Sequence, residues 1–154
     1  MSELSKRKYD YWEDIFPAAQ TAEAMLEAVD QDMSRLPEAV RVFLSVNGAQ
    51  GAMDNGGFVF FFGADWPGTP PYEEFIVAYE AIGCVEQAAA LRRIVATFPF
   101  ADPHLHKGKR KKFIEARYDK EAFGVPEWGS IRAFGQEVWE KLAEYHRKHK
   151  REFA

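Results

Sequence analysis

Apolar residues recur at intervals of three and four positions along most of this 154-residue chain. This spacing places successive side chains on one face of an α-helix. No stretch alternates polar and apolar residues between hairpin turns, so the sequence gives a sheet little support. The pattern predicts an all-α fold of six or seven helices in antiparallel or orthogonal packing. The clearest run is Ile131, Phe134, Val138, Leu142 and Tyr145, continued by His149.

Prolines, glycines and capping residues divide this pattern into segments. We expect Pro17 and Gly48 to stop helices, and Thr21, Thr69 and Ser130 to cap the helices that follow them. Only one or two residues separate the two middle helices, which must therefore be antiparallel or sharply angled neighbours. The expected helices cover 4–16, 21–36, 37–48, 72–83, 85–98, 113–118 and 130–151, with loops at 64–71 and 99–112.

The composition fits one domain over residues 1–154. Hydrophobic residues make up 47% of the chain and aromatic residues 15%, which is enough for a core. The single cysteine, Cys84, excludes an intramolecular disulfide and a cysteine-based zinc site, and it fits a reducing compartment. The polar start, Met1 to Lys8, does not resemble a secretory signal, and the apolar run from Phe58 to Phe62 is too short to span a membrane. We therefore expect a cytoplasmic protein without a membrane partner.

Charge is distributed unevenly. Residues 1–100 hold 7 Lys/Arg and 15 Asp/Glu, whereas residues 101–154 hold 13 and 9, so the net charges are −8 and +4. Such asymmetry is typical of proteins with charged partners, but charge of this size mainly serves solubility, so we expect a solvated surface with a basic end. The basic clusters at 107–112 and 146–151 contain no interleaved aromatic residue, so we expect a solvated loop, a solvated helix end and no direct nucleic-acid binding. The acids crowd near the N-terminus, at Asp10, Glu13, Asp14, Glu23 and Glu27, followed by Asp30, Asp32 and Glu38.

Chemistry-bearing motifs are sparse. His104 and His106 have only Asp102 as a neighbouring carboxylate, so we expect no metal site. No nucleophile elbow, phosphate loop or zinc-protease motif is present. Cys84 stands at a helix start, which lowers a thiol pKa, although a buried, small apolar role fits it better. We expect no cofactor and no enzyme activity.

One segment, residues 54–62, has the character of a motif. Asp54 or Asn55 is placed to cap a buried helix, with Gly56 and Gly57 in its first turn at a cost of about 1 kcal/mol each. Either another element packs closely on these glycines, or their backbone N–H groups face a ligand or partner. We expect Phe58, Phe61 and Phe62 in the core, whereas Phe60 must meet a second packing surface or lie exposed.

Asn55-Gly56-Gly57-Phe58, followed by the Phe61-Phe62 pair, resembles the signature of a bacterial DNA-mimic-protein-like (DMP-type) family of all-helical domains of unknown function. Leu36-Pro37-Glu38 and the helix end at Ile82-Gly83 extend the resemblance over about residues 36–100. It implies a bacterial cytoplasmic protein and allows a homodimer. The family's named member is an acidic dimer that occupies the DNA-binding face of a regulator. Polar positions of the family around the motif are apolar here, at Ala52, Met53, Phe60, Gly63 and Ala64, so the resemblance implies no polar ligand chemistry there.

These observations favour a non-enzymatic module that binds another protein. The first candidate surface comprises Asp54, Asn55, Gly56, Gly57, Phe60 and Trp66. The second is formed by the N-terminal acids, which would serve an acidic DNA mimic that sequesters a DNA-binding regulator. A third alternative is a small-ligand binder or enzyme with a pocket near Gly56 and Gly57.

Overall fold

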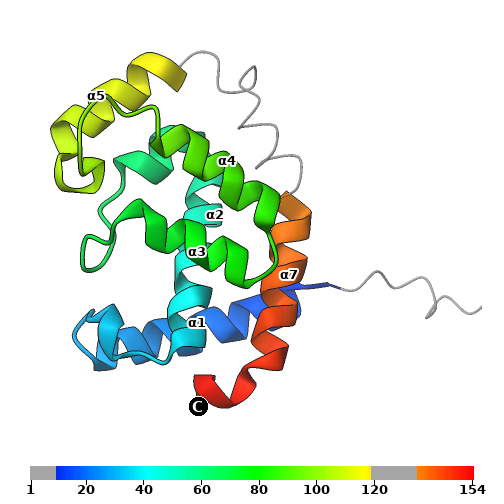
Figure 1. Cartoon of the computed structure of the whole chain (residues 1–154). Coiled ribbons are helices and arrows are strands. Elements are labelled where there is room, and N and C mark those ends of the chain that lie inside the picture. The colour runs from blue at the N-terminus through cyan, green and yellow to red at the C-terminus, as the bar shows by residue number, and fades with distance from the viewer. Residues whose placement is uncertain (1–9, 119–134) are drawn as a thin grey trace, which may run out of the picture.

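The computed structural model describes residues 10–118 and 135–154, and within these ranges it contains six α-helices and no strand, which confirms the predicted all-α fold (Figure 1). Three short 3₁₀ helices, at Met33–Arg35, Pro103–Leu105 and Lys150–Phe153, lie between or after them. The α-helices are α1 (Trp12–Ala28), α2 (Glu38–Gly63), α3 (Tyr72–Ala81), α4 (Val85–Val95), α5 (Lys107–Tyr118) and α7 (Gly135–Lys148).

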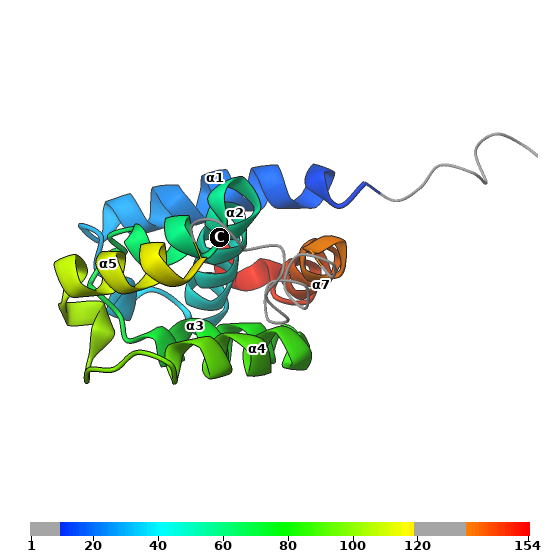
Figure 2. The ribbon, with the colours of Figure 1, turned by 90° about the horizontal axis from the view of Figure 1, so that it is seen from above.

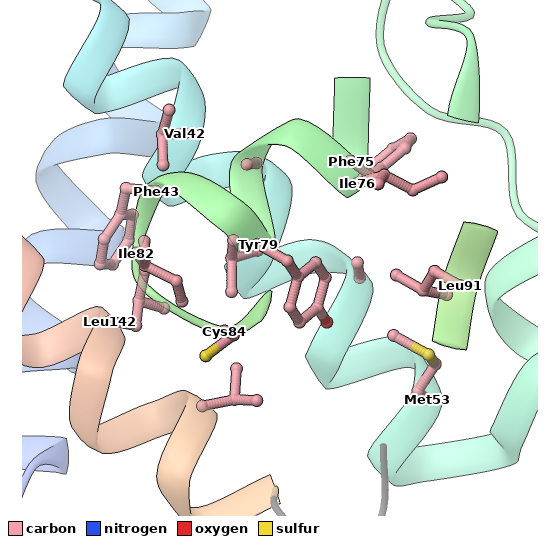
Figure 3. Close-up of a cluster of buried hydrophobic side chains, with 14 of the residues drawn as sticks. Val42, Phe43, Met53, Phe75, Ile76, Tyr79, Ile82, Cys84, Leu91 and Leu142 are labelled. Atoms are coloured by element: carbon pink, nitrogen blue, oxygen red, sulfur yellow. The ribbon is translucent and has the colours of Figure 1, made fainter. Parts of the chain in front are cut away.

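The long helix α2 runs through the middle of the molecule and contacts α1, α3, α5 and α7. Viewed from above, α1 lies on one side of α2, and the paired helices α3 and α4 lie on the other (Figure 2). Helix α7 also packs on α1. The buried side chains of the described helices form one core, in which Tyr79, Phe43 and Leu142 come from three different helices (Figure 3).

The sequence predicted that a helix stops at Pro17, but α1 continues through this residue. Pro17 lies in its second turn, and Thr21, the expected cap of a separate helix, lies in its middle. A proline in the second turn removes one backbone hydrogen bond and crowds the carbonyl four residues before it, yet its φ suits a helix and α1 continues through it. The helix ends at Ala28, and a turn with positive φ at Asp30 and Gln31 replaces the expected helix to residue 36.

Helix α2 likewise continues through Gly48, where we expected a stop. A Cβ atom at Gly48 would lie 2.8 Å from Cζ3 of Trp66. The glycine is therefore needed for the close approach of an indole ring, and it costs only helix propensity where it stands.

The α3–α4 connection follows the prediction. Gly83 has a φ of +91°, and the N–H groups of Gly83 and Cys84 donate to the carbonyls of Glu80 and Tyr79 at 2.9 and 2.8 Å. This is a Schellman ending, which turns the chain sharply into α4. Two details were wrong. Pro71 instead of Thr69 precedes α3, and Val85, placed in the apolar stripe of α4, is 64% exposed.

The basic segment 107–112 is helical, although we expected it to belong to a loop. Helix α5 begins at Lys107, and Arg110 within it is buried. The last helix is described from Gly135 to Lys148 and is followed by a 3₁₀ turn. The predicted cap Ser130 and the first positions of the stripe, Ile131 and Phe134, lie outside the described residues.

Candidate functional site

The Asn-Gly-Gly-Phe segment divides α2 into two helical parts joined by a kink at Gly56 and Gly57, so the expected helix follows the glycines and does not include them in its first turn. Gly56 has φ −155° and ψ 20°, and Gly57 has φ 67° and ψ −158°, both outside the helical region. The conformation of Gly57 is one that residues with a Cβ rarely adopt. The Nδ2 of Asn55 donates to the Gly51 carbonyl at 2.8 Å, so Asn55 serves the helical turn before the break and does not cap the turn after it.

Phe60 lies directly over Gly56. A Cβ atom at Gly56 would come within 2.1 Å of Cγ of Phe60, so the missing side chain makes room for this ring. The other face of the ring is open, since Phe60 is 56% exposed. Phe58, Phe61 and Phe62 are buried, as the sequence predicted.

Asp54 is held in a hydrogen-bonded chain that joins three helices. Gln50 Nε2 donates to Asp54 Oδ1 at 2.8 Å, and Trp139 Nε1 donates to Asp54 Oδ2 at 2.9 Å. Tyr79 Oη donates to Gln50 Oε1 at 2.8 Å, and burial raises the pKa of Tyr79 well above its ordinary value. The carboxylate of Asp54 thus connects the core to the surface, because Gln50 and Tyr79 are fully buried whereas Asp54 is exposed.

Sequence reasoning missed both Gln50 and Trp139. The four-residue spacing between Gln50 and Asp54, with a polar amide inside an apolar stretch, was a readable signal. Nothing in the sequence paired Trp139 with Asp54, because 85 positions separate them.

Trp66 closes the end of α2. Its Nε1 donates to the Phe61 carbonyl at 3.1 Å, and its ring packs on Phe61 and Phe75. Arg110 donates from Nε to the next carbonyl, that of Phe62, at 2.5 Å. Both side chains therefore satisfy carbonyls that a helix end leaves without a partner.

A shallow hollow lies beside this helix end. Asp65, Thr69, Tyr72 and His104 line it around Arg110, and neither Gly56 nor Gly57 contributes to it. Burial raises the pKa of Tyr72 to about 12, so this phenol stays protonated. Arg110 donates to the carbonyls of Phe62, Pro103 and His104, which commits its guanidinium to the fold.

The structure supports neither a reactive Cys84 thiol nor a metal site among the described residues. Burial raises the pKa of the Cys84 thiol to about 12, and the lowering expected of a helix start does not occur. Within residues 10–118 and 135–154, no group of three or more His, Cys, Asp or Glu side chains is arranged to hold a metal ion.

The acids just before α1 and along it fall into two groups. Asp10 Oδ1 accepts the backbone N–H of Trp12 at 3.0 Å at the helix start, and Asp14 pairs with Arg147 at 3.1 Å. Glu13, Glu23 and Glu27 are exposed. Together with Phe16 and Gln20 they form a stripe with spacings of 3, 4, 3 and 4, which is one face of a helix. Residues 9–34 contain no Lys, Arg or His.

The fold and these contacts define an all-helical domain with a kinked central helix, whose end is bonded by polar side chains of the same chain. In one flanking helix, α1, every charged residue is acidic. The chain belongs to the DMP19-like protein family, whose model matches residues 34–149. This confirms the resemblance seen in the sequence. The match extends beyond residues 36–100 to α7, and it begins after α1. The chain has no significant match among curated proteins or among solved structures.

Among the described helices, none is both long and apolar enough to cross a membrane.

Proposed function

We propose that this protein is a non-enzymatic module that binds a cationic protein through the outer face of α1, at the stripe formed by Glu13, Phe16, Gln20, Glu23 and Glu27. The observation that carries the proposal is that Phe16, 63% exposed, lies among three exposed carboxylates on a helix without a single cation. An exposed aromatic ring within a field of one sign suits recognition of another protein, because the ring supplies buried area and the charges supply steering and specificity.

The surface around residues 54–62 with Trp66, the first choice from the sequence, has less support. Asp54, Asn55 and Trp66 hydrogen-bond within the chain, and the two glycines shape the break in α2. Of those residues, Phe60 alone combines a large apolar side chain with high exposure. Phe60 therefore remains a secondary contact in this proposal.

DNA mimicry is a narrower version of the same function. From Glu13 to Glu27 the helix rises about 21 Å, a length over which a DNA duplex carries about twelve phosphates. The stripe offers three exposed carboxylates over that length. The family match begins after α1, so the family model does not cover the acidic stripe. The support for this stripe as a binding surface is therefore the charge of this chain alone. We therefore propose a cationic protein in general as the partner, with a DNA-binding protein as the special case.

A capture experiment with matched charge variants tests the proposal. The tagged protein is compared with Glu23→Lys/Glu27→Lys on α1 and with Glu74→Lys/Glu86→Lys on α3 and α4, which changes the net charge equally. We expect the α1 variant alone to lose proteins with basic surfaces that the parent releases at high salt. Capture of the same proteins by both variants would contradict the proposal. Release by duplex DNA would identify the partner's DNA-binding face as the docked surface.

The ligand-binding alternative at Gly56 and Gly57 is the weakest, because Phe60 covers the first glycine and the second is buried. A thermal-shift screen of small metabolites tests it, since a specific ligand raises the melting temperature with its concentration. A homodimer, which the resemblance allows, is tested by sedimentation equilibrium.

A further inference from the structure

The beginning of α1 carries a cluster of aromatic rings that reaches across to α7. The ring centroid of Trp12 lies 4.8 Å from that of Trp139, 5.0 Å from that of Tyr11 and 5.2 Å from that of Phe16, on which it stacks. Trp139 is buried, Tyr11 and Trp12 are partly exposed, and Phe16 is largely exposed. The cluster therefore exposes Phe16 and parts of Tyr11 and Trp12 to solvent, with the buried Trp139 beneath them.

Carboxylates surround this cluster. Trp139 Nε1 donates to Asp54 Oδ2, and Gln50 holds the other oxygen, so the carboxylate has a fixed orientation at the surface. Glu140 follows Trp139 on α7, is exposed, and accepts a hydrogen bond from Gln136 at 2.9 Å. The pKa of Tyr11 is raised, first by burial and then by the negative charges of Glu140, Asp10 and Asp54.

We propose that this surface, the Trp12 patch formed by Tyr11, Trp12, Phe16, Trp139, Asp54 and Glu140, anchors an arginine side chain of a cationic protein partner. The inference rests on the proposed function and specifies its central contact. The patch adjoins the acidic stripe of α1, since Phe16 belongs to both.

The chemistry of the patch selects arginine over lysine. A guanidinium is planar and weakly hydrated, so it stacks on an indole or phenyl face while its N–H groups reach carboxylates at the edge. Each oxygen of Asp54 receives one donor from within the protein, and each keeps a lone pair for a donor from outside. A lysine ammonium offers a compact charge and no flat face, so the aromatic part of the patch would contribute less to its binding.

Two peptides of equal charge, nona-arginine and nona-lysine, test the inference. Each is titrated at low salt into the full-length ¹⁵N-labelled protein, and the indole N–H signals of Trp12, Trp139 and Trp66 are followed. We expect nona-arginine to bind about fivefold more tightly and to shift the signals of Trp12 and Trp139. The Trp66 signal serves as an internal reference, because its indole is bonded to the Phe61 carbonyl.

Two variants examine the anchor directly. Trp12→Leu and Glu140→Gln should each reduce the preference for arginine towards unity. Glu23→Gln, which removes one charge from the stripe outside the patch, should weaken both peptides equally. Glu140→Gln alters one exposed side chain, so it keeps the test decisive if Trp12→Leu fails to fold.

The outcomes separate the two proposals. Equal binding of both peptides, with an unmoved Trp12 signal, would overturn the arginine anchor and leave the proposed function standing. Absence of binding by either peptide at low salt would overturn both. An arginine preference that survives Trp12→Leu and Glu140→Gln would place the anchor elsewhere and refute the Trp12 patch.

Discussion

Nε of Arg110 lies 2.5 Å from the carbonyl oxygen of Phe62, so a cationic side chain on α5 closes the C-terminal end of α2, 48 positions away. The same guanidinium donates to the carbonyls of Pro103 and His104. A positive charge at this end also interacts favourably with the negative end of the helix dipole. Arg110 belongs to the basic run that we expected in a solvated loop. It is instead buried, and its hydrogen bonds connect α5 to α2 and to the segment before α5.

Replacement of Arg110 by Met should destabilise the protein, because it keeps an apolar stem and leaves buried carbonyls without donors. We expect a loss of about 2–4 kcal/mol in the free energy of unfolding. Urea unfolding monitored by circular dichroism measures it. Lys112→Met on the same helix is the control, and it should change stability by less than about 0.5 kcal/mol because Lys112 is exposed. Equal effects of the two substitutions would show that the hydrogen bonds of Arg110 do not stabilise the fold.

Gly57→Ala should destabilise the protein by about 1–3 kcal/mol, because the φ of 67° and ψ of −158° are strained for any residue with a Cβ. Gly57→Val, which is bulkier, should cost at least as much. Gly51→Ala is the matched control within α2, where an added Cβ meets nothing within 4 Å. There we expect a gain of about 0.4–1 kcal/mol from helix propensity and a less flexible unfolded chain. Thermal unfolding of Gly57→Ala and Gly51→Ala measures these changes. Equal stability of the two variants would show that the kink in α2 does not require glycine at position 57.

Tyr79→Phe should cost about 1–3 kcal/mol, because it removes the donor to Gln50 Oε1 in the fully buried core. Trp139 fluorescence should respond as well if Gln50 shifts and releases its hold on Asp54. Tyr145→Phe is a control at a partly exposed phenol, and it should leave the unfolding free energy nearly unchanged. A stability for Tyr79→Phe equal to that of the parent would show that the hydrogen-bonded chain is dispensable.

His146 should make the protein sensitive to mild acid. Burial lowers the pKa of His146 in the folded protein, and its Nδ1 has no hydrogen-bond partner within the described structure. Its ring meets those of Phe43 and Phe153 edge-on, which are poor surroundings for an imidazolium. The unfolded chain therefore binds the proton more readily than the folded protein. The contribution of His146 to the free energy of unfolding is fully present above about pH 6.5, and it is lost as the pH falls through the lower pKa of the folded protein.

His146→Leu removes the titrating ring and keeps the apolar contacts with Phe43 and Phe153. We expect a smaller decrease in the unfolding free energy between about pH 7 and pH 5.5 for this variant than for the parent. Urea titrations at a series of pH values measure both slopes. Identical slopes would show that His146 does not contribute.

Local patterns in the sequence determined the fold class and much of the core. The spacing of apolar residues predicted α3, α4 and the described part of α7, and it placed Phe58, Phe61 and Phe62 inside. Gly83 ended α3 as predicted, because a Schellman turn depends only on neighbouring backbone groups. The Asn-Gly-Gly-Phe signature also identified the family, which the match over residues 34–149 confirms.

Only the tertiary structure decided where α1 and α2 end and what the polar residues do. Pro17 and Gly48 are ordinary stop signals, yet packing carries the helices through both, and the ring of Trp66 lies on Gly48. The donor to Asp54 Oδ2 and the donor to the Phe62 carbonyl come from residues 85 and 48 positions away. Periodicity reports how a segment meets the core, whereas the partner of a polar group depends on which helices meet, and that is settled when the chain packs.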